Sequence, residues 1–174
     1  MKNTKLITML CLGALIACSP SKKGLEPTSE QVSPRERLIE NLRATPQKGI
    51  MFGHHDDTVY GIGWEFDEGG SDVQKVCGDY PAVISFDLGE IELGGDKSLD
   101  KVPFEKIRKE IINQYNRGGL VSLSWHPRNP KTGGDAWDVS DHAVVKSILP
   151  EGENYEKFQS WLGKVNDFIL SLKT

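Results

Sequence analysis

The order of short apolar strands and longer helices constrains this chain more than any other feature. Apolar runs at residues 49–53, 81–86 and 120–125 are each followed by a segment whose apolar residues recur at helical spacing. These runs are nearly continuous, as in strands that are covered on both faces. Strand and helix in alternation predict a parallel α/β sheet, which could be a doubly wound open sheet or a (β/α)8 barrel. No glycine-rich phosphate loop follows the first run, so the dinucleotide-binding form of the open sheet is disfavoured.

Capping residues and apolar spacing predict where the helices lie. Ser33-Pro34-Arg35-Glu36 predicts a capping box at the start of the first helix. Ser71 predicts the N-cap of a short helix that ends at Gly78. The positions that mark the two long helices are Phe104, Ile107, Ile111 and Tyr115, followed by Gly118-Gly119, and then Tyr155, Phe158, Trp161, Leu162, Val165, Phe168, Ile169 and Leu172.

The N-terminal residues predict a lipoprotein signal peptide. Lys2 and Lys5 precede an uncharged apolar run that is too short to cross a bilayer as a stable helix. The run ends in Leu15-Ile16-Ala17-Cys18, which resembles the lipobox of bacterial lipoproteins; an ordinary signal peptide with an incidental cysteine is the alternative. We expect residues 1–17 to be removed and Cys18 to carry lipid, with 18–32 as a flexible linker to a domain over 33–174. Such a protein would be held at the cell envelope, in the periplasm or on the outer-membrane surface.

Charge and cysteine content disfavour two classes of protein. The formal net charge of −4 argues against a nucleic-acid partner, which needs a basic face. Of the three cysteines, Cys11 lies in the predicted signal peptide and Cys18 would be lipidated, which leaves Cys77 without a partner and the chain without a disulfide framework. Because Cys77 stands among apolar residues, we expect it to be a small buried side chain.

Polar side chains gather after each of the three predicted strands. The clusters are residues 53–57 (Gly-His-His-Asp-Asp), 87–90 (Asp-Leu-Gly-Glu) and 125–130 (Trp-His-Pro-Arg-Asn-Pro), and they hold three of the four histidines. Because the C-terminal ends of parallel strands share one edge of a sheet, the clusters predict a single site at that edge.

The first cluster has structural and chemical interpretations that compete. Adjacent residues on a strand point to opposite sides, so only one of His54 and His55 is expected to face a cleft. Asp56 and Asp57 could instead cap the following turn. His54, His55 and Asp56 could also be metal ligands, but zinc sites place their ligands at spaced positions on one face, which adjacent histidines do not satisfy.

The tryptophans and glutamates near the other strand ends are also ambiguous. Trp64 could anchor a loop by packing on a neighbouring element. Trp137 has few apolar neighbours in its glycine-rich loop, so a role as an aromatic surface for a ligand is favoured. Glu90 and Glu92 could be read as a catalytic carboxylate pair. They share one backbone segment, however, and a glycosidase needs carboxylates that flank the bond from different places.

Two stretches within these clusters carry a family resemblance. They are Gly53-His54-His55-Asp56-Asp57 with Tyr60-Gly61, and Ser124-Trp125-His126-Pro127-Arg128-Asn129-Pro130. Together they resemble glycoside hydrolase family 26, whose best-known members are endo-β-1,4-mannanases, over roughly residues 35–174. The resemblance implies an α/β protein that forms the first three or so β/α units of a (β/α)8 TIM barrel. It also implies retaining hydrolysis of β-mannan-type polysaccharide or oligosaccharide, with no cofactor and no metal.

The resemblance also implies a set of substrate-binding residues. His126 would contact substrate on the glycone side of the cleft, Asn129 would support that loop, and Trp137 would stack on or border a sugar. The group of His54, His55, Asp56 and Asp57 would line the floor of the cleft or orient neighbouring side chains. Tyr60, Trp64 and Asp87 complete the predicted substrate-binding residues.

The two catalytic glutamates of the family match no position of this sequence. They belong to the ends of the fourth and seventh barrel strands, and a full barrel takes about 250 residues. We therefore expect this chain to be the truncated N-terminal part of a secreted mannanase, inactive alone and poorly stable because one strand edge and one apolar face stay uncovered. Two other functions stay open: a non-catalytic glycan-binding lipoprotein, and a metal-dependent hydrolase.

Overall fold

The computed structural model describes residues 32–173, which form two compact units divided after Ala44. The predicted signal peptide, Cys18 and nearly all of the predicted linker lie outside the described residues. None of the described helices is long and apolar enough to cross a membrane.

The first unit consists of helix α1 (Pro34–Ala44), and its start confirms the predicted capping box. The backbone amide of Glu36 donates to Ser33 Oγ at 3.2 Å, and the amide of Ser33 donates to Glu36 Oε2 at 2.9 Å. These two bonds satisfy amides that have no partner within the helix.

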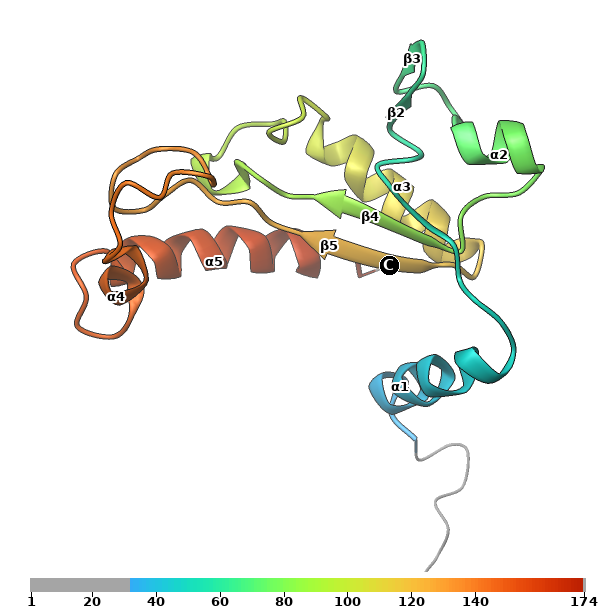
Figure 1. The fold of residues 1–174 in the computed structure, drawn as a ribbon, viewed down its shortest axis with the longest axis horizontal. Helices are drawn as coiled ribbons and strands as arrows, with labels where there is room; N and C mark the ends of the chain where they lie inside the picture. The colour runs from blue at the N-terminus through green and yellow to red at the C-terminus, as the bar shows by residue number, and fades with distance from the viewer. Residues whose placement is uncertain (1–31, 174) are drawn as a thin grey trace, which may run out of the picture. The chain divides into compact units, whose positions relative to one another are not determined.

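The second unit is built on a parallel three-stranded sheet with strands β1 (Gly53–His55), β4 (Val83–Asp87) and β5 (Leu120–Ser124) in that order (Figure 1). The predicted succession of strand and helix is therefore confirmed. The remaining elements are η1 (Thr45–Gln47), the antiparallel hairpin β2 (Tyr60–Gly61) and β3 (Trp64–Glu65), α2 (Asp72–Cys77), η2 (Ile91–Leu93), α3 (Phe104–Asn116), α4 (Val144–Ile148) and α5 (Tyr155–Leu170).

One face of the sheet is covered by helices and holds the hydrophobic core. Ile84 and Phe86 of β4 are 0% exposed and pack with Ile107 and Ile111 of α3 and with Phe168 of α5. Val121 and Leu123 of β5, which pair in register with Ile84 and Phe86, complete this face. Burying these side chains removes apolar surface from water, which stabilises this unit.

The opposite face of the sheet carries small and polar side chains. The register places His55, Ser85 and Ser122 side by side in one row, and Asp87 beside Ser124 in the next. Ser122 is exposed, so this face is open to solvent in the described part of the chain. Alternation along β4 thus sends its apolar residues to the helices and its polar residues to the open face.

Helix α3 differs from its predicted apolar stripe at the last turn. Ile107, Glu110, Ile111 and Gln114 are buried, whereas Tyr115 is 74% exposed. The four buried positions centre on one helical face, and position 115 lies about 90° from that centre, at the edge of the face, because each residue turns the helix by about 100°. The Gln114 amide is satisfied there by donating to the Pro81 carbonyl at 3.0 Å.

The first strand and its helix are much less covered than predicted. Strand β1 begins only at Gly53, and the apolar residues before it are exposed, Ile50 at 98% and Phe52 at 59%. Helix α2 has the predicted bounds and caps, yet it buries none of its residues, and Val76 is 85% exposed. The predicted burial of Cys77 is wrong, because within residues 45–173 no element packs over this side of α2.

Candidate functional site at the C-terminal strand ends

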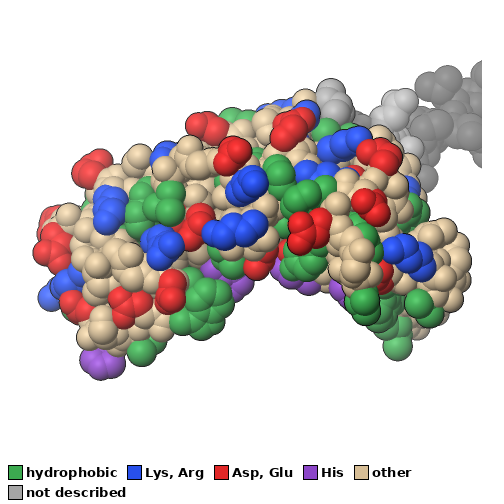
Figure 2. Space-filling model, turned by 90° about the horizontal axis from the view of Figure 1, so that it is seen from above, with side chains coloured by type: hydrophobic (Ala, Val, Ile, Leu, Met, Phe, Trp, Pro, Cys, Tyr) green, Lys and Arg blue, Asp and Glu red, His purple; other side chains and the backbone are tan. Residues whose placement is uncertain are grey.

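The three polar clusters lie at one edge of the sheet because its strands are parallel. The chain leaves β1 at Asp56, β4 at Leu88 and β5 at Trp125, and all three exits are on the same side. Hydrogen bonds tie the exits together: the Asp56 amide donates to Ser85 O and the Leu88 amide to Ser124 O, both at 2.8 Å. In the space-filling view, histidine side chains appear along the hollowed side of the molecule (Figure 2).

Asp87 and His126 form the centre of this edge. The Asp87 carboxylate is 2% exposed and accepts hydrogen bonds from Ser124 Oγ at 2.6 Å, from the Gly89 amide at 2.5 Å and from His126 Nδ1. Burial alone would raise the pKa of Asp87, but these bonds outweigh it and hold the pKa below its usual value. The ionised carboxylate orients the imidazole of His126 through Nδ1. This leaves Nε2 available for a hydrogen bond to a ligand.

Trp137 and His126 form an aromatic pair at the mouth of the site. Their rings stack with centroids 5.6 Å apart and an interplanar angle of 7°. Trp137 is 66% exposed, so one face of its indole remains free. A cavity of about 180 Å³ opens here, lined by Glu90, Leu99, His126, Arg128, Asp135, Ala136 and Trp137.

Two glutamates from the loop after β4 brace the loop after β5. Glu90, whose φ of 71° is in the left-handed region, accepts a hydrogen bond from Arg128 Nη2 at 2.6 Å. Glu92 is 1% exposed and accepts from Trp125 Nε1 at 2.9 Å and from the Arg128 amide at 2.7 Å. Both carboxylates are therefore used to position a loop, and Glu92 is withdrawn from any ligand.

Asn129 stabilises the same loop from inside. Its side-chain oxygen accepts from the amides of Lys131 and Thr132 at 3.0 and 3.1 Å, and its side-chain nitrogen donates to the Asp138 carbonyl at 3.1 Å. Asn129 is 6% exposed. Asn129 therefore holds the loop through backbone groups of three other residues, and its contact with a sugar stays a prediction.

His54 and His55 point to opposite sides of β1. The His55 ring lies on the open face, with Nδ1 2.5 Å from Ser85 Oγ and Nε2 3.3 Å from Asp56 Oδ2. The His54 ring folds back, with Nδ1 2.8 Å from the carbonyl of His55. The two adjacent histidines therefore do not converge on one ion, which argues against the metal-dependent hydrolase built from both.

Asp56 and Tyr60 lie beside His55. Tyr60 Oη donates to Asp56 Oδ2 at 3.3 Å. Asp56 is 2% exposed, and burial raises its pKa to about 6 against the opposing effect of His55. Burial and the nearby Asp56 and Asp100 carboxylates raise the pKa of Tyr60 to about 12. A carboxyl with a raised pKa can serve as a general acid, but one this buried cannot touch a polysaccharide.

Trp64 and Asp57 hold the loop after β1 in place. The Trp64 indole is 8% exposed and donates to Asp72 Oδ1 at 2.7 Å. A Cβ at Gly61 or Gly70 would come within 2.3 Å of this side chain, so both glycines are needed for the close approach. Asp57 accepts from Ser71 Oγ and from the Val73 amide at the start of α2. Loop anchoring, one of the two interpretations of Trp64, thus fits its position better than sugar contact.

Comparison with known proteins places these features in a family. Residues 27–174 match the model for glycosyl hydrolase family 26. A mannan endo-1,4-β-mannosidase of Bifidobacterium adolescentis is 30% identical over 132 residues, which is 74% of this chain and 13% of that protein.

Solved structures agree with the sequence match. A family 26 β-mannanase from Bacteroides ovatus aligns with a TM-score of 0.77 and 64% identity, over 79% of this chain and 40% of that one. The catalytic domain of an endo-β-1,4-mannanase from Bacillus sp. JAMB-750 aligns with a TM-score of 0.65 and 29% identity, over 78% of this chain and 37% of that one. These enzymes are (β/α)8 barrels, so the parallel strands described here are part of a barrel and not an open doubly wound sheet. The chain spans well under half the length of each relative.

Proposed function

Because this chain belongs to glycosyl hydrolase family 26, we propose that it forms the first three β/α units of an enzyme that cleaves β-mannan. The observation that carries the proposal is the pairing of Asp87 with His126, and of His126 with the exposed Trp137, at the shared strand edge. The relatives are mannanases by name, and the same edge is where barrel enzymes bind their substrates.

The geometry suits a sugar ring. A pyranose presents an apolar face of C–H groups and a rim of hydroxyls, so it needs an aromatic surface and nearby donors and acceptors. The free face of Trp137 offers the surface, and His126, Arg128 and Glu90 line the cavity beside it with hydrogen-bonding groups. Since His126 and Arg128 are each held by a carboxylate, binding would cost little side-chain entropy.

We propose that the chain alone binds mannan and does not cleave it. Retaining hydrolysis needs two carboxyl groups about 5 Å apart, one on each side of the bond. At the edge described here, Asp87 and Glu92 are buried and Glu90 is paired with Arg128. The resemblance places both catalytic glutamates outside residues 33–174, so cleavage would require the further strands of the barrel.

Binding and cleavage can be separated in one experiment. We expect the full chain to be retarded in a native gel that contains galactomannan, and to release no reducing sugar from the same polymer. Trp137→Ala should abolish the retardation, because it removes the stacking surface. Tyr115→Ala, an equally exposed aromatic on α3, is the matched control and should leave it unchanged. Release of reducing sugar by the chain would contradict the claim of inactivity, and equal retardation of both variants would contradict the site.

A glycan-binding lipoprotein without catalysis is the second candidate function. The buried or paired carboxylates of the strand edge favour it. Extending the gene by the remaining barrel strands of the Bacteroides ovatus relative decides between the two. Hydrolysis by the extended chain supports the enzyme fragment, and retention without hydrolysis supports the binding protein.

We also propose that the protein is anchored to the cell envelope through lipid on Cys18. The support is the sequence Leu15-Ile16-Ala17-Cys18 at the end of an apolar run. Mass spectrometry of the membrane-extracted protein should show a diacylglyceryl modification at Cys18, and Cys18→Ser should release the protein into the soluble fraction. An unmodified N-terminus at another residue would contradict the anchor.

A further inference from the structure

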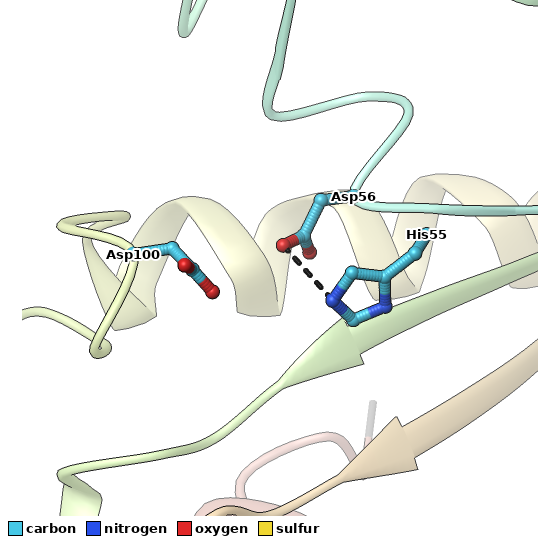
Figure 3. A group of neighbouring side chains, drawn as sticks. All are labelled: His55, Asp56 and Asp100. Carbon is cyan, nitrogen blue, oxygen red and sulfur yellow. Dashed lines mark ion pairs between the residues drawn. The ribbon is translucent and has the colours of Figure 1, made fainter.

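Three metal-binding side chains meet beside the end of β1. His55, Asp56 and Asp100 each place one ligand atom within 4.8 Å of the others (Figure 3). His55 is the last residue of β1, Asp56 follows it directly, and Asp100 comes from the loop before α3. The Asp56 carboxylate points into the space between the Asp100 carboxylate and the His55 imidazole (Figure 3).

Asp56 contributes a buried oxygen that lacks a partner. Its side chain is 2% exposed, and Oδ1 makes no hydrogen bond, a situation shared in the described part of the chain only by Thr58 Oγ1. An unsatisfied buried acceptor costs free energy, and more so when it belongs to a charged group. A cation bound by both oxygens of the Asp56 carboxylate would supply the missing interaction at Oδ1.

His55 is oriented in the way that metal-binding histidines are. Its Nδ1 lies 2.5 Å from Ser85 Oγ, and its Nε2 faces Asp56. Histidine ligands typically donate one ring N–H to an outer hydrogen-bond partner, which leaves the other nitrogen to bind the metal. Ser85 is well placed to be that partner.

Asp100 is accessible and lacks a competing cation. It is exposed and, among residues 32–173, takes part in no ion pair within 4.0 Å. It lines a cavity of about 400 Å³, together with Tyr60, Glu65, Phe66, Lys97 and Lys101, through which an ion could enter. Lys97 and Lys101 share this cavity with Asp100 without pairing with it.

We propose that His55, Asp56 and Asp100 bind a divalent metal ion of the zinc class. In a tetrahedral zinc site, ligand atoms lie roughly 3.3 Å apart, since each is about 2.0 Å from the ion. His55 Nε2 and Asp56 Oδ2 are already 3.3 Å apart, so only Asp100 has to approach. One imidazole and two carboxylates suit Zn²⁺ better than Ca²⁺, which prefers six to eight oxygen ligands. The ion would tie the end of β1 to the loop before α3, with water as fourth ligand.

Zinc titration of the chelator-treated full chain tests the proposal without mannan, so its outcome is independent of the proposed function. We expect one equivalent of Zn²⁺ per chain by calorimetry, without displacement by Ca²⁺. His55→Gln and Asp100→Asn should abolish the uptake, and Ser85→Ala should weaken it about 10- to 100-fold, as loss of an outer partner does. His54→Gln is the matched control, because its ring points away, and should bind like the unchanged chain.

Three results would overturn the site. They are an absence of stoichiometric Zn²⁺ uptake, uptake that His55→Gln and Asp100→Asn leave intact, and equal loss in His54→Gln and His55→Gln. Both His55 and Asp100 are exposed, so these variants should keep the fold, which circular dichroism would verify.

Discussion

The first β/α unit and the two that follow it have similar sequence patterns and different environments. In the second unit, Phe86 of β4 and Ile107 of α3 are at most 1% exposed, and in the third unit Phe168 of α5 is 9% exposed. In the first unit, Phe52, which directly precedes β1, and Val76 of α2 are 59% and 85% exposed. Apolar periodicity therefore specifies which side of an element can be buried, whereas a neighbour on that side decides whether it is buried. Strand β1 pairs with β4 alone among the described strands, and nothing there packs over its free edge.

The largest difference in the free energy of unfolding is expected between variants of two phenylalanines. Phe86→Ala should reduce the free energy of unfolding by about 3–5 kcal/mol, because it leaves a cavity in the core. Phe52→Ala should change it by less than about 0.5 kcal/mol, as exposed substitutions do, and should also reduce aggregation by shrinking an apolar patch. Urea unfolding followed by tryptophan fluorescence measures both. Similar losses in the two variants would mean that the first unit is as well covered as the second.

The helices offer a parallel test. Ile107→Ala on α3 should cost about 2–4 kcal/mol, since Ile107 is 1% exposed, and Val76→Ala on α2 should cost almost nothing. The same unfolding experiment applies, and thiol labelling adds a second readout. Cys77 should react with a maleimide in the native chain at nearly the rate seen in urea, because it is exposed. Protection of Cys77 would contradict an uncovered α2.

A buried and an exposed carboxylate, Asp87 and Asp96, test whether the contrast in burial also holds for charged groups. Asp87→Asn should cost about 1–3 kcal/mol at neutral pH, because it weakens hydrogen bonds to a buried carboxylate. The folded-state pKa of Asp87 is lowered, so its contribution is present above the unfolded pKa of about 3.9 and is lost as pH falls through the folded value. The two stability curves should therefore converge in acid. Asp96→Asn, at an exposed site, is the control, and a gap that does not narrow as the pH falls below the unfolded pKa would sink the assignment.

The smallest expected effect is on the solvent side of α3. Glu105 accepts from Arg108 at 2.7 and 2.9 Å, but its side chain is 75% exposed. Glu105→Gln should leave the free energy of unfolding almost unchanged, and 1 M salt should remove any difference that remains. A cost near that of Ile107→Ala would show that helix position, and not burial, controls stability in the second unit.

The sequence was sufficient to predict the parallel sheet, most helix bounds and the shared edge of polar residues. These features depend on local interactions. Ser33, Ser71 and Gly78 cap the ends of the helices in which they occur. The C-terminal ends of parallel strands lie at one edge of the sheet, independently of the rest of the chain. The predictions of burial failed where burial depended on the helical phase or on whether a neighbouring element covers the residue. Gln114 and Tyr115 are adjacent, and hydrophobicity favoured the tyrosine, although the helical phase and the Pro81 carbonyl favour the glutamine.

Parts of the candidate site also escaped sequence reasoning. Asp100 lies 44 positions after Asp56 in an unremarkable turn, and no local pattern connects them. Glu92 could be noticed beside Glu90, but its contacts with Trp125 and Arg128 depend on how two loops meet. Contacts that cross between chain segments are set by tertiary packing, for which a single sequence carries no periodic signal. The sugar contacts of His126 and Trp137 remain predictions.

The buried Glu92 gives the region after β5 a second point of attachment. Its carboxylate holds the beginning of that region from the preceding unit, so Trp125 and the backbone of Arg128 have an attachment that does not involve the distal residues 131–138. Evolution, or an engineer, could lengthen or shorten this distal part and change which sugar substituents are tolerated, while the proximal residues stay where they are.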